Sequence, residues 1–541
     1  MATFPTPKAV TINKFLGIRT KDVKTGIDGS ISAQFATNIE LEVSDDGSGV
    51  SIKTTLGNKI FLDLADYTEL NLDTPKIIDI FETEQDGTKY LMIYLIDKTL
   101  KGCLLCCNPN LSTPTVELLV SNLTVTSASN GITIHSTAYD VFVFTNGVEY
   151  YSYSVSQVTP LVKLQPKYDG KDVTGLALAE YRGSLVIGCD NGVVIGSRQG
   201  DITDWNYTEN DQTKAWYQLF YKKITALVPY IDGLLVFTDD SSVLLSGNLS
   251  YATDAVRSSA SIGGCFNHKS WIIHDKYLFF YDNNQKNIYY YLQNDIGEKV
   301  LGKPIADEIQ NMLSKAINLS LISYIGNNKN EIWLRITDKH GSDRIIIYNY
   351  LYGEYTERKM NIINGFNKWN FKILSFDDTK IFEERTGGCI NCTFNGVYIP
   401  ASYKSIPMNF GSYTNLKEED IKPLITYDKS YNNNFAVSFT NQKKTKKKRF
   451  ELNQGLDFTW GNDEPQDEET PDRERWSGDA ESYAIFASED SKQIATVKAK
   501  APSSFYYMNF EIYTEKDGDD FCIKQIEMRD ITIETDTTGT K

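Results

Sequence analysis

The 541-residue chain has few histidines, no long apolar run and no excess of basic residues. No apolar stretch approaches the roughly 20 residues that a membrane-spanning helix needs. The N-terminal MATFPTPKAVTINKF lacks the apolar core of a secretory signal, so we expect synthesis in a cytosol, where the 8 cysteines stay reduced. The net charge of -16 argues against a free nucleic-acid binder, which usually needs a basic face.

Motifs for nucleotide and nucleophile chemistry are also missing from the sequence. We find no P-loop, no Gly-x-Gly-x-x-Gly after a strand, and no motif context for a Ser-His-Asp triad. Nucleotide use and nucleophilic hydrolysis are therefore unsupported, and we expect no cofactor.

What the sequence does contain is a repeated unit of strand, turn and strand, in a chain that is 12% aromatic. A short apolar strand meets a turn rich in Asp, Asn and Gly, and a second apolar or aromatic strand follows at once. Aromatic and β-branched side chains pack well on pleated sheets. The copies begin at Tyr90, Val141, Leu185, Leu234, Leu278, Ile332 and Ile373.

The spacing of these copies runs from 41 residues, between Ile332 and Ile373, to 54 residues, between Leu278 and Ile332. A period of about 40 to 50 residues with several strands per unit is the signature of propeller blades. We therefore predict an all-β fold, a six- or seven-bladed β-propeller. The alternative is a β-sandwich with regularly spaced hairpins.

The propeller is predicted to occupy residues 61–400, between an extended N-terminal arm with short strands (1–60) and a C-terminal β-sandwich-like domain (401–541). Apolar residues at helical spacing in 303–317 predict one short helix inserted between two blades. The C-terminal domain carries an acidic loop, 462–474, and a basic run. The interaction candidates of that run are Lys443, Lys444, Lys446, Lys447, Lys448 and Arg449. Both segments are predicted to be either solvated loops or docking sites for a neighbouring subunit. The basic run could also contact DNA phosphate.

The N-terminal segment resembles the opening of tail-hub, packaged-DNA-stabilising propeller proteins of tailed bacteriophages, of the podophage and crAss-like kind. Three later segments resemble successive parts of the same proteins: GSRQGDITDWN (196–206), ITALVPYIDGLLVFTDDSSVLLSGN (224–248) and SIGGCFNHKSWIIHDKYLFFYDNN (261–284). The gap from Lys53 to Gly57 is one residue longer than in the family's pattern. The matching N-terminal residues are Phe15, Gly17, Ile18, Asp28, Gly29, Asn38, Ile39 and Gly57.

The resemblance implies a structural virion protein, assembled in the host cytoplasm and located in the virion tail. Such proteins form a homo-oligomeric ring, here expected to be six- or twelve-fold, below the portal. The ring extends the DNA channel, helps to retain the packaged genome and anchors other tail proteins. The implied partners are other tail and portal-ring proteins and the DNA that passes through. An acidic protein suits a conduit, because DNA slides where attraction is weak.

Glycoside hydrolysis is the main rival chemistry, because it needs only a pair of carboxylates. Asp239, Asp240, Asp282, Asp377 and Asp378 all fall at hairpin tips, where turn formation explains them without catalysis. We expect no enzyme activity. The alternatives kept open are a tail-tip propeller that binds or hydrolyses host surface glycans, and a free cytoplasmic scaffold.

Two Cys-x-x-Cys pairs, Cys103 with Cys106 and Cys389 with Cys392, could together hold zinc. Alternation along a strand would instead point Cys103 and Cys106 to opposite faces, which favours buried thiols and no metal. His268 and His274 have the same parity and read as a packed pair on one strand face. The Asp-Gly-Asp-Asp sequence at 517–520 could attract calcium, but no full ligand loop follows it.

Overall fold

The computed structural model confirms the predicted fold class: the protein is almost all β, with small sheets in a ring that forms a β-propeller. The structure describes residues 8–19, 29–43, 47–111, 114–135, 140–208, 211, 214–230, 233–249, 255–259, 263–292, 307–326, 329–359, 363–386, 393–394, 396–408, 422–428, 431, 433–452, 494–502 and 507–531.

The chain divides into two compact units. One unit contains Lys59–Gly353 and Met360–Glu384 and is the propeller. The other contains Met1–Asn58, Glu354–Lys359 and Arg385–Lys541. The segment that we expected to be an N-terminal arm and the expected C-terminal domain thus share one unit.

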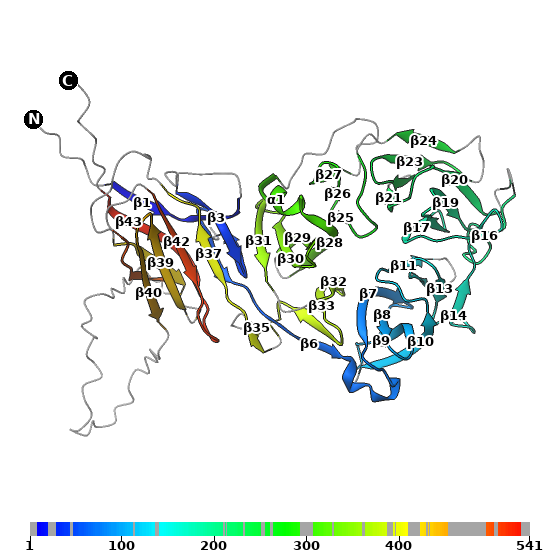
Figure 1. Cartoon of the computed structure of the whole chain (residues 1–541), viewed down its shortest axis with the longest axis horizontal. Coiled ribbons are helices and arrows are strands. Elements are labelled where there is room, and N and C mark those ends of the chain that lie inside the picture. The colour runs from blue at the N-terminus through cyan, green and yellow to red at the C-terminus, as the bar shows by residue number, and fades with distance from the viewer. Residues whose placement is uncertain are drawn as a thin grey trace, which may run out of the picture. The chain divides into compact units, whose positions relative to one another are not determined.

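Six small sheets stand in a ring (Figure 1). A three-strand segment of a larger sheet, β28–β30, lies between the last two of them, because β28 lies beside both β25 and β32. The strands of the first three sheets are β7 (Lys76–Gln85), β8 (Thr88–Asp97), β9 (Lys101–Asn108) and β10 (Thr115–Leu123); β11 (Asn130–His135), β12 (Asp140–Thr145), β13 (Tyr150–Tyr153) and β14 (Leu161–Leu164); and β17 (Ala177–Tyr181), β18 (Ser184–Gly188), β19 (Val193–Gly196) and β20 (Trp216–Leu219).

The remaining strands of the ring follow in chain order. They are β21 (Ala226–Tyr230), β22 (Gly233–Phe237), β23 (Ser242–Ser246) and β24 (Val256–Ser259); β25 (Trp271–His274), β26 (Tyr277–Asp282) and β27 (Asn287–Leu292); β28 (Ala316–Gly326), β29 (Lys329–Asp338) and β30 (Asp343–Asn349); and β32 (Gly365–Trp369), β33 (Lys372–Phe376) and β34 (Lys380–Glu384), joined by β6 (Asn58–Asp63).

Each of the seven repeat copies found in the sequence is an antiparallel hairpin in the structure. The hairpins are β8–β9, β12–β13, β18–β19, β22–β23, β26–β27, β29–β30 and β33–β34. Middle strands such as β18 and β22 are buried at every residue. Their apolar runs do not alternate, because neighbouring sheets cover both faces.

The Asp and Asn residues in the turns of these hairpins accept hydrogen bonds from backbone N–H groups, as expected from the turn composition. In the β8–β9 hairpin, Asp97 Oδ1 accepts the backbone N–H groups of Thr99 (2.8 Å) and Leu100 (2.7 Å). Side-chain oxygens accept backbone N–H groups in the same way at Asn146, Asp282, Asp338 and Asp377. The repeated Asp and Asn residues therefore satisfy backbone donors that the turn would leave unpaired.

The ring closes where the first and last strands of the propeller meet. Strand β6 joins the sheet of β32–β34 at β34, and the inner strand β32 lies beside β7. The Leu64 N–H donates to Thr379 O at 3.0 Å, and Lys380 pairs with Asp63 at 3.3 Å. Strand β34, from the last blade in chain order, thus pairs with β6 at the start of the propeller. This pairing closes the ring by hydrogen bonds, without a covalent link.

The inserted helix is present but shorter than predicted. A 3-10 turn, η3 (Asp307–Ile309), runs into α1 (Gln310–Leu313) between β27 and β28. Ile309 and Leu313 are buried, as a helical face requires. Ile317 was wrongly placed in the helix: it lies in β28 and is 56% exposed. Strand pairing with β29 begins at Ala316 and ends the helix there. Residues 303–306 lie outside the described part of the chain.

The strands of the other unit belong to one hydrogen-bonded sheet that folds back on itself at β3, which pairs with both β2 and β37, so that two layers face each other. One layer holds β2, β5, β43, β38 and β41, with β1 on β43 and β4 on β5. The second holds β3, β37, β42, β39 and β40. Phe15 of β2 packs edge-on against Tyr403 of β37 (5.6 Å between ring centroids) and Phe510 of β42 (6.5 Å). The layers thus meet in an aromatic core, as in a β-sandwich.

The bounds of the strands in this unit follow. They are β1 (Lys8–Ile12), β2 (Lys14–Ile18), β3 (Ser30–Thr37), β4 (Ile39–Val43), β5 (Val50–Thr54), β31 (Glu354–Arg358), β35 (Thr393–Phe394), β36 (Val397–Tyr398), β37 (Ser402–Ser405), β38 (Leu424–Asp428), β39 (Asn434–Asn441), β40 (Thr445–Glu451), β41 (Ile494–Lys498), β42 (Met508–Tyr513) and β43 (Cys522–Ile531).

Three of the N-terminal residues singled out in the sequence have backbone constraints in this unit. A Cβ on Gly17 would lie 2.4 Å from Tyr355 O, and one on Gly57 would lie 1.8 Å from Thr393 O. Asn38 adopts a left-handed φ of 54°, and its Nδ2 donates to Pro400 O at 3.0 Å. These positions need a glycine or an asparagine for backbone reasons. Asp28 lies outside the described residues.

In the described part of the chain, none of the helices has the length and apolar character needed to cross a membrane.

Candidate functional site

A turn at Phe266–Ser270, just before β25, crosses the centre of the propeller. The ring order places β25 three positions from β7 in one direction and three positions from β11 in the other. Yet Lys269 forms an ion pair with Asp79 of β7, and His268 Nε2 donates to the carbonyl oxygen of Ser129, beside β11, at 3.0 Å. The turn therefore reaches the opposite wall and occupies the propeller axis.

The turn is rigid because its own polar groups are paired. Asn267 Oδ1 accepts the Lys269 N–H at 2.8 Å, and Ser270 Oγ accepts the Asn267 N–H at 2.8 Å. Lys269 O accepts the N–H of Leu321, in β28, at 2.8 Å. A side wall of the ring thus also holds the turn.

Asp79 is the buried anion that receives this turn. Its side chain is 3% exposed, and burial raises its pKa against the opposing effect of Lys269. Ser129 Oγ donates to Oδ2 at 3.0 Å, and the Ile80 N–H donates to Oδ1 at 3.1 Å. The Lys269 ammonium also lies 5.8 Å from the Phe81 ring centroid. Hydrogen bonds and a paired cation are what a buried carboxylate needs to stay charged.

His268 is half-buried at the same place and stays neutral. Burial lowers its pKa to about 3, helped by the positive charges of Lys269 and Lys223. Because a carbonyl oxygen only accepts, the neutral ring must carry its proton on Nε2. The prediction that His268 and His274 form a packed pair on one strand is wrong. His268 lies in the turn, whereas His274 Nδ1 contacts Ser323 Oγ at 2.7 Å.

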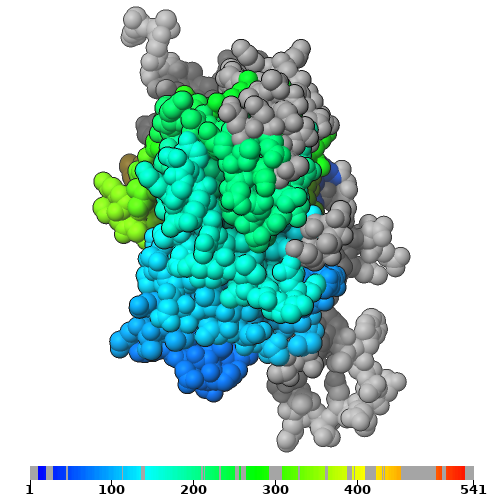
Figure 2. Space-filling model, turned by 90° about the vertical axis from the view of Figure 1, so that its right-hand side faces the viewer, coloured from blue at the N-terminus to red at the C-terminus, as the bar shows by residue number. Residues whose placement is uncertain are grey.

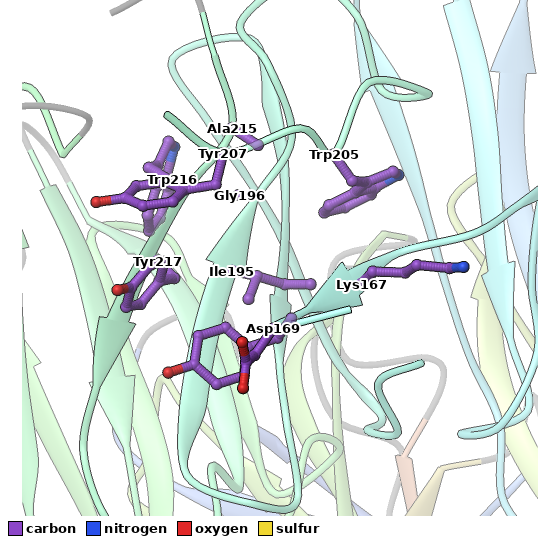
Figure 3. A pocket seen from close by; sticks show the side chains of 10 residues that line it. Lys167, Asp169, Ile195, Gly196, Trp205, Tyr207, Ala215, Trp216 and Tyr217 are labelled. Carbon is purple, nitrogen blue, oxygen red and sulfur yellow. The ribbon is translucent and has the colours of Figure 1, made fainter. Parts of the chain in front are cut away.

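A second feature is a pocket of about 280 Å³ lined mainly by aromatic side chains (Figure 3). It lies between the β19–β20 connection and a small hairpin, β15 (Lys167–Tyr168) and β16 (Lys171–Asp172). Strands β14, β16 and β20 lie on the outer side of the ring (Figure 1), and this part of the chain faces the viewer in Figure 2. The lining residues are Lys167, Tyr168, Asp169, Ile195, Gly196, Trp205, Tyr207, Ala215, Trp216 and Tyr217.

The β15–β16 hairpin places Tyr168 and Asp169 at the pocket. Asp169 and Gly170 have φ values of 52° and 71°, and Tyr168 pairs with Lys171 across them. Two left-handed residues are what the tightest hairpin turn requires, and Asp-Gly is a preferred sequence for it. The turn therefore sets both side chains at the pocket.

The opposite side of the pocket is built by the segment GSRQGDITDWN, residues 196–206. Asp201 Oδ1 accepts the Thr203 N–H at 2.9 Å, and Asp204 Oδ1 accepts the Asn206 N–H at 3.0 Å. These carboxylates fold the loop so that Trp205 and Tyr207 line the pocket. Gly196 serves the same site: a Cβ there would lie 2.1 Å from the Trp216 ring, which packs over the strand.

The aromatic rings contact one another around the pocket. Tyr217 packs edge-on against Tyr168 (4.9 Å) and Tyr207 (4.7 Å). Trp205 lies on the other side of Ile195 from Tyr207, Trp216 and Tyr217 (Figure 3). Burial, with the negative charge of Asp169 and the neighbouring Tyr217, raises the pKa of Tyr168, so its hydroxyl stays protonated at neutral pH. The pocket thus combines apolar ring faces with a few polar groups, the usual pattern of a small-ligand site.

The basic run lies in a hairpin strand and its turn. Arg449 of β40 forms a two-bond pair with Asp519 (2.7 and 2.9 Å), whose side chain is fully buried. Burial alone would raise the pKa of Asp519, but hydrogen bonds from Arg449 and two backbone N–H groups lower it overall. Lys447 pairs with Glu515, and Lys448 Nζ donates to Lys498 O at 3.1 Å. Part of the run thus stabilises its own unit.

Besides Lys447, which pairs with Glu515, three lysines of the run are exposed at the hairpin end: Lys443, Lys444 and Lys446. They are the members of the run that are placed for contact with an outside anion. The acidic stretch 462–474 lies outside the described residues. Within the Asp-Gly-Asp-Asp sequence, Asp519 is held by Arg449, and Asp520 Oδ1 accepts the Asn433 N–H at 2.9 Å. These two carboxylates therefore hold the loop in place.

Cys103 and Cys106 point to opposite faces of β9, as strand alternation predicts. Cys103 packs between this sheet and β33–β34, whereas Cys106 packs toward Phe142 and Phe144 of the next sheet. Burial raises the pKa of each thiol to about 12. Cys389 and Cys392 lie outside the described residues. Among the residues that the structure describes, no cluster of three or more His, Cys, Asp or Glu side chains could hold a metal ion.

Four of the five hairpin-tip carboxylates are engaged in turns, hydrogen bonds or an ion pair. Asp282 and Asp377 cap backbone N–H groups, and Asp378 Oδ1 accepts a hydrogen bond from Asn364 Nδ2 at 2.8 Å. Asp240 pairs with Lys222. At Asp239 the backbone carbonyl oxygen, not the carboxylate, accepts a hydrogen bond from Asn284 Nδ2 at 3.1 Å. Turn formation thus accounts for most of these residues.

Neither the axial turn nor the pocket was predicted as a site from the sequence. The available signals were Asn-His-Lys-Ser before a strand, the Asp-Gly turn at 169–170 and the Trp and Tyr residues of 205–217. Each signal is short, and only the ring brings their partners together.

Comparison with known proteins assigns no family. No family model and no curated protein matches the chain. Three solved structures illustrate the structural similarity. They are the crystal structure of BBS1N in complex with ARL6DN, soaked with mercury (10% identity, 58% of this chain, 93% of that chain, TM-score 0.34); the computationally designed Ika8 protein (12%, 61%, 100%, 0.33); and a chain of the Mitotic Checkpoint Complex (11%, 58%, 92%, 0.36). TM-scores of this size carry no argument about function.

Proposed function

We propose that this protein is a structural component of a bacteriophage tail hub. Several copies would form a ring below the portal that extends the DNA channel, helps to retain the packaged genome and anchors other tail proteins. The sequence resemblance motivates the proposal. The supporting observation concerns three residues of the N-terminal motif. At Gly17 and Gly57 an added Cβ would clash with a neighbouring backbone, and Asn38 has a left-handed φ. A motif of this kind specifies a scaffold, not a reaction.

The occupied propeller axis restricts how such a ring could conduct DNA. The Lys269–Asp79 pair and the His268–Ser129 hydrogen bond span the axis. A buried ion pair is costly to break, so DNA would not pass through an individual propeller. In the proposed ring, the channel would instead run between the copies, along the symmetry axis of the assembly.

The charges of the protein also fit a channel component. The net charge of -16 gives DNA little general attraction, whereas Lys443, Lys444 and Lys446 are exposed for local contact with phosphate or a neighbouring acidic surface. Under this proposal the protein needs no catalytic group. The carboxylates that could suggest hydrolysis have turn or ion-pair roles.

Purified virions test the proposal directly. Quantitative mass spectrometry should find the protein in particles, at a copy number that matches the portal symmetry or a simple fraction or multiple of it. Cryo-electron microscopy of the tail should show the copies around the channel. Presence in infected-cell lysate together with absence from purified particles would reject the proposal and favour the free cytoplasmic scaffold.

The alternative is a tail-tip propeller that binds or hydrolyses host surface glycans. Incubation of the full chain with purified host polysaccharide, followed by size analysis of the products, separates the hydrolytic form of this alternative from the hub. Release of short oligosaccharides would favour this alternative over the tail-hub proposal.

A further inference from the structure

We infer that the aromatic pocket between the β15–β16 hairpin and the β19–β20 connection binds one neutral pyranose unit of a glycan. This goes beyond the hub role, because a ring component needs no small-ligand pocket on the outer side of its propeller. The pocket residues come from four short segments, at 167–169, 195–196, 205–207 and 215–217. The tight turn at Asp169 and the side-chain hydrogen bonds of Asp201 and Asp204 hold two of these segments in place without a ligand.

The chemistry of the lining matches the two kinds of surface that a pyranose presents. The C–H face of a sugar ring is apolar and packs on aromatic faces, whereas its rim carries hydroxyl groups that donate and accept hydrogen bonds. Tyr207, which is 47% exposed, and the half-buried Tyr217 offer ring surface at 4.7 Å from each other. The Tyr168 hydroxyl and the Asp169 carboxylate add polar contacts beside these rings.

The charge of the lining favours a neutral ligand. The Asp169 carboxylate can accept hydrogen bonds from sugar hydroxyl groups, whereas a sugar carboxylate or sulfate offers it no donor. Lys167 is the one basic residue among those that line the pocket, so the two formal charges balance. The surrounding protein, with a net charge of -16, adds no attraction for an anion.

The size of the pocket limits the occupant to about one ring. Its volume of about 280 Å³ lies near the lower end of the range for small-ligand sites, roughly 300 to 1,000 Å³. A longer glycan would therefore place a single terminal or branch unit in the pocket and leave the rest in solvent.

The pocket is equipped to bind a sugar and not to cleave it. Glycoside hydrolysis uses two carboxyl groups about 5 to 9.5 Å apart. Among the residues that line the pocket, Asp169 is the one carboxylate. The inferred activity is therefore recognition without turnover.

Saturation-transfer NMR on the full chain tests the inference. The probes are glucose, galactose, mannose and N-acetylglucosamine, each presented alone, with glucuronic acid as the charged comparison. We expect transfer to the ring C–H protons of at least one neutral sugar, and at least fivefold weaker transfer to glucuronic acid. Tyr207→Ala and Asp169→Asn should each reduce the transfer at least fivefold.

The matched control is Tyr507→Ala, which removes a 42% exposed tyrosine outside the pocket lining and should leave transfer unchanged. Because Tyr207 and Asp169 are exposed, circular dichroism should show that their variants still fold. No transfer from any neutral sugar, or transfer that both pocket variants retain, would overturn the inference. If no sugar binds, but an aromatic peptide binds and Tyr207→Ala abolishes its binding, the pocket is assigned to a protein partner instead. Neither result bears on virion incorporation, which tests the hub proposal separately.

Discussion

The Lys269 ammonium pairs with the Asp79 carboxylate across the axis of the propeller, although 190 residues separate them in the chain. Asp79 belongs to the first blade, and Lys269 precedes the inner strand of a sheet on the opposite side of the ring. A single ion pair therefore joins two walls of the ring that do not otherwise adjoin.

Replacing Lys269 by Met should destabilise the propeller by about 3 kcal/mol. The change leaves Asp79 buried without its cation, and breaking a buried pair costs roughly 3–5 kcal/mol. We take the lower end because the Lys269 side chain is 35% exposed. Asp79→Asn should cost less, because the freed ammonium can turn toward solvent. Urea denaturation measures both, and Lys98→Met, which alters a 73% exposed lysine, should change stability by less than about 0.5 kcal/mol. An unchanged midpoint for Lys269→Met would show that the turn does not brace the ring.

The stability of the propeller should fall with acidity through His268. Its folded-state pKa is about 3, below the ordinary histidine value of 6.5, so the unfolded chain binds the extra proton first. The contribution is fully present above about pH 6.5 and is lost as pH falls toward about 3, at up to about 1.4 kcal/mol per pH unit.

Urea midpoints at pH 5.0, 5.5, 6.0 and 6.5 follow this effect, and comparison with a His268 variant removes the contribution of carboxylates with a raised pKa, such as Asp79. His268→Gln keeps a side-chain N–H for Ser129 O and should flatten the slope. His340→Gln, at an exposed position, should leave the slope as in the wild type. Equal slopes for all three proteins would contradict a neutral His268.

Gly17→Ala should destabilise the unit that contains β2 by about 1–3 kcal/mol. The added methyl group would lie 2.4 Å from Tyr355 O and 2.6 Å from Tyr355 N, so one strand must move. Gly326→Ala is the comparison, because its Cβ would lie 3.3 Å from the nearest atoms and needs only a small adjustment. Differential scanning calorimetry should show a lower transition temperature for Gly17→Ala than for Gly326→Ala. The reverse order would remove the packing explanation for the motif glycine.

Arg449→Met should cost about 2–3 kcal/mol, because it leaves the fully buried Asp519 carboxylate without its two-bond partner. Lys446→Met, from the same basic run, should cost less than about 0.5 kcal/mol, because its side chain is exposed. Thermal denaturation at neutral pH compares the two. Similar losses for both variants would show that the run acts as one charged surface and not through Arg449.

Much of the fold could be predicted from local patterns. Hairpin turns can be predicted from Asp and Asn residues, because their side-chain oxygens accept backbone N–H groups only a few residues away. The residues that do so here are Asp97, Asn146, Asp282, Asp338 and Asp377. The spacing of these hairpins then implies blades. The opposite orientations of Cys103 and Cys106 also followed from strand alternation alone.

Only the tertiary structure decided which distant segments of the chain make contact. Ring closure determines that Lys269 meets Asp79 and that His268 meets Ser129, and no local pattern encodes which blades face each other. Layer packing in the other unit determines that Arg449 holds Asp519. The pocket exists because the turn at Asp169 meets the loop that carries Trp205. Sequence specifies elements through short-range hydrogen bonding and burial patterns, whereas sites arise where the closed ring brings those elements together.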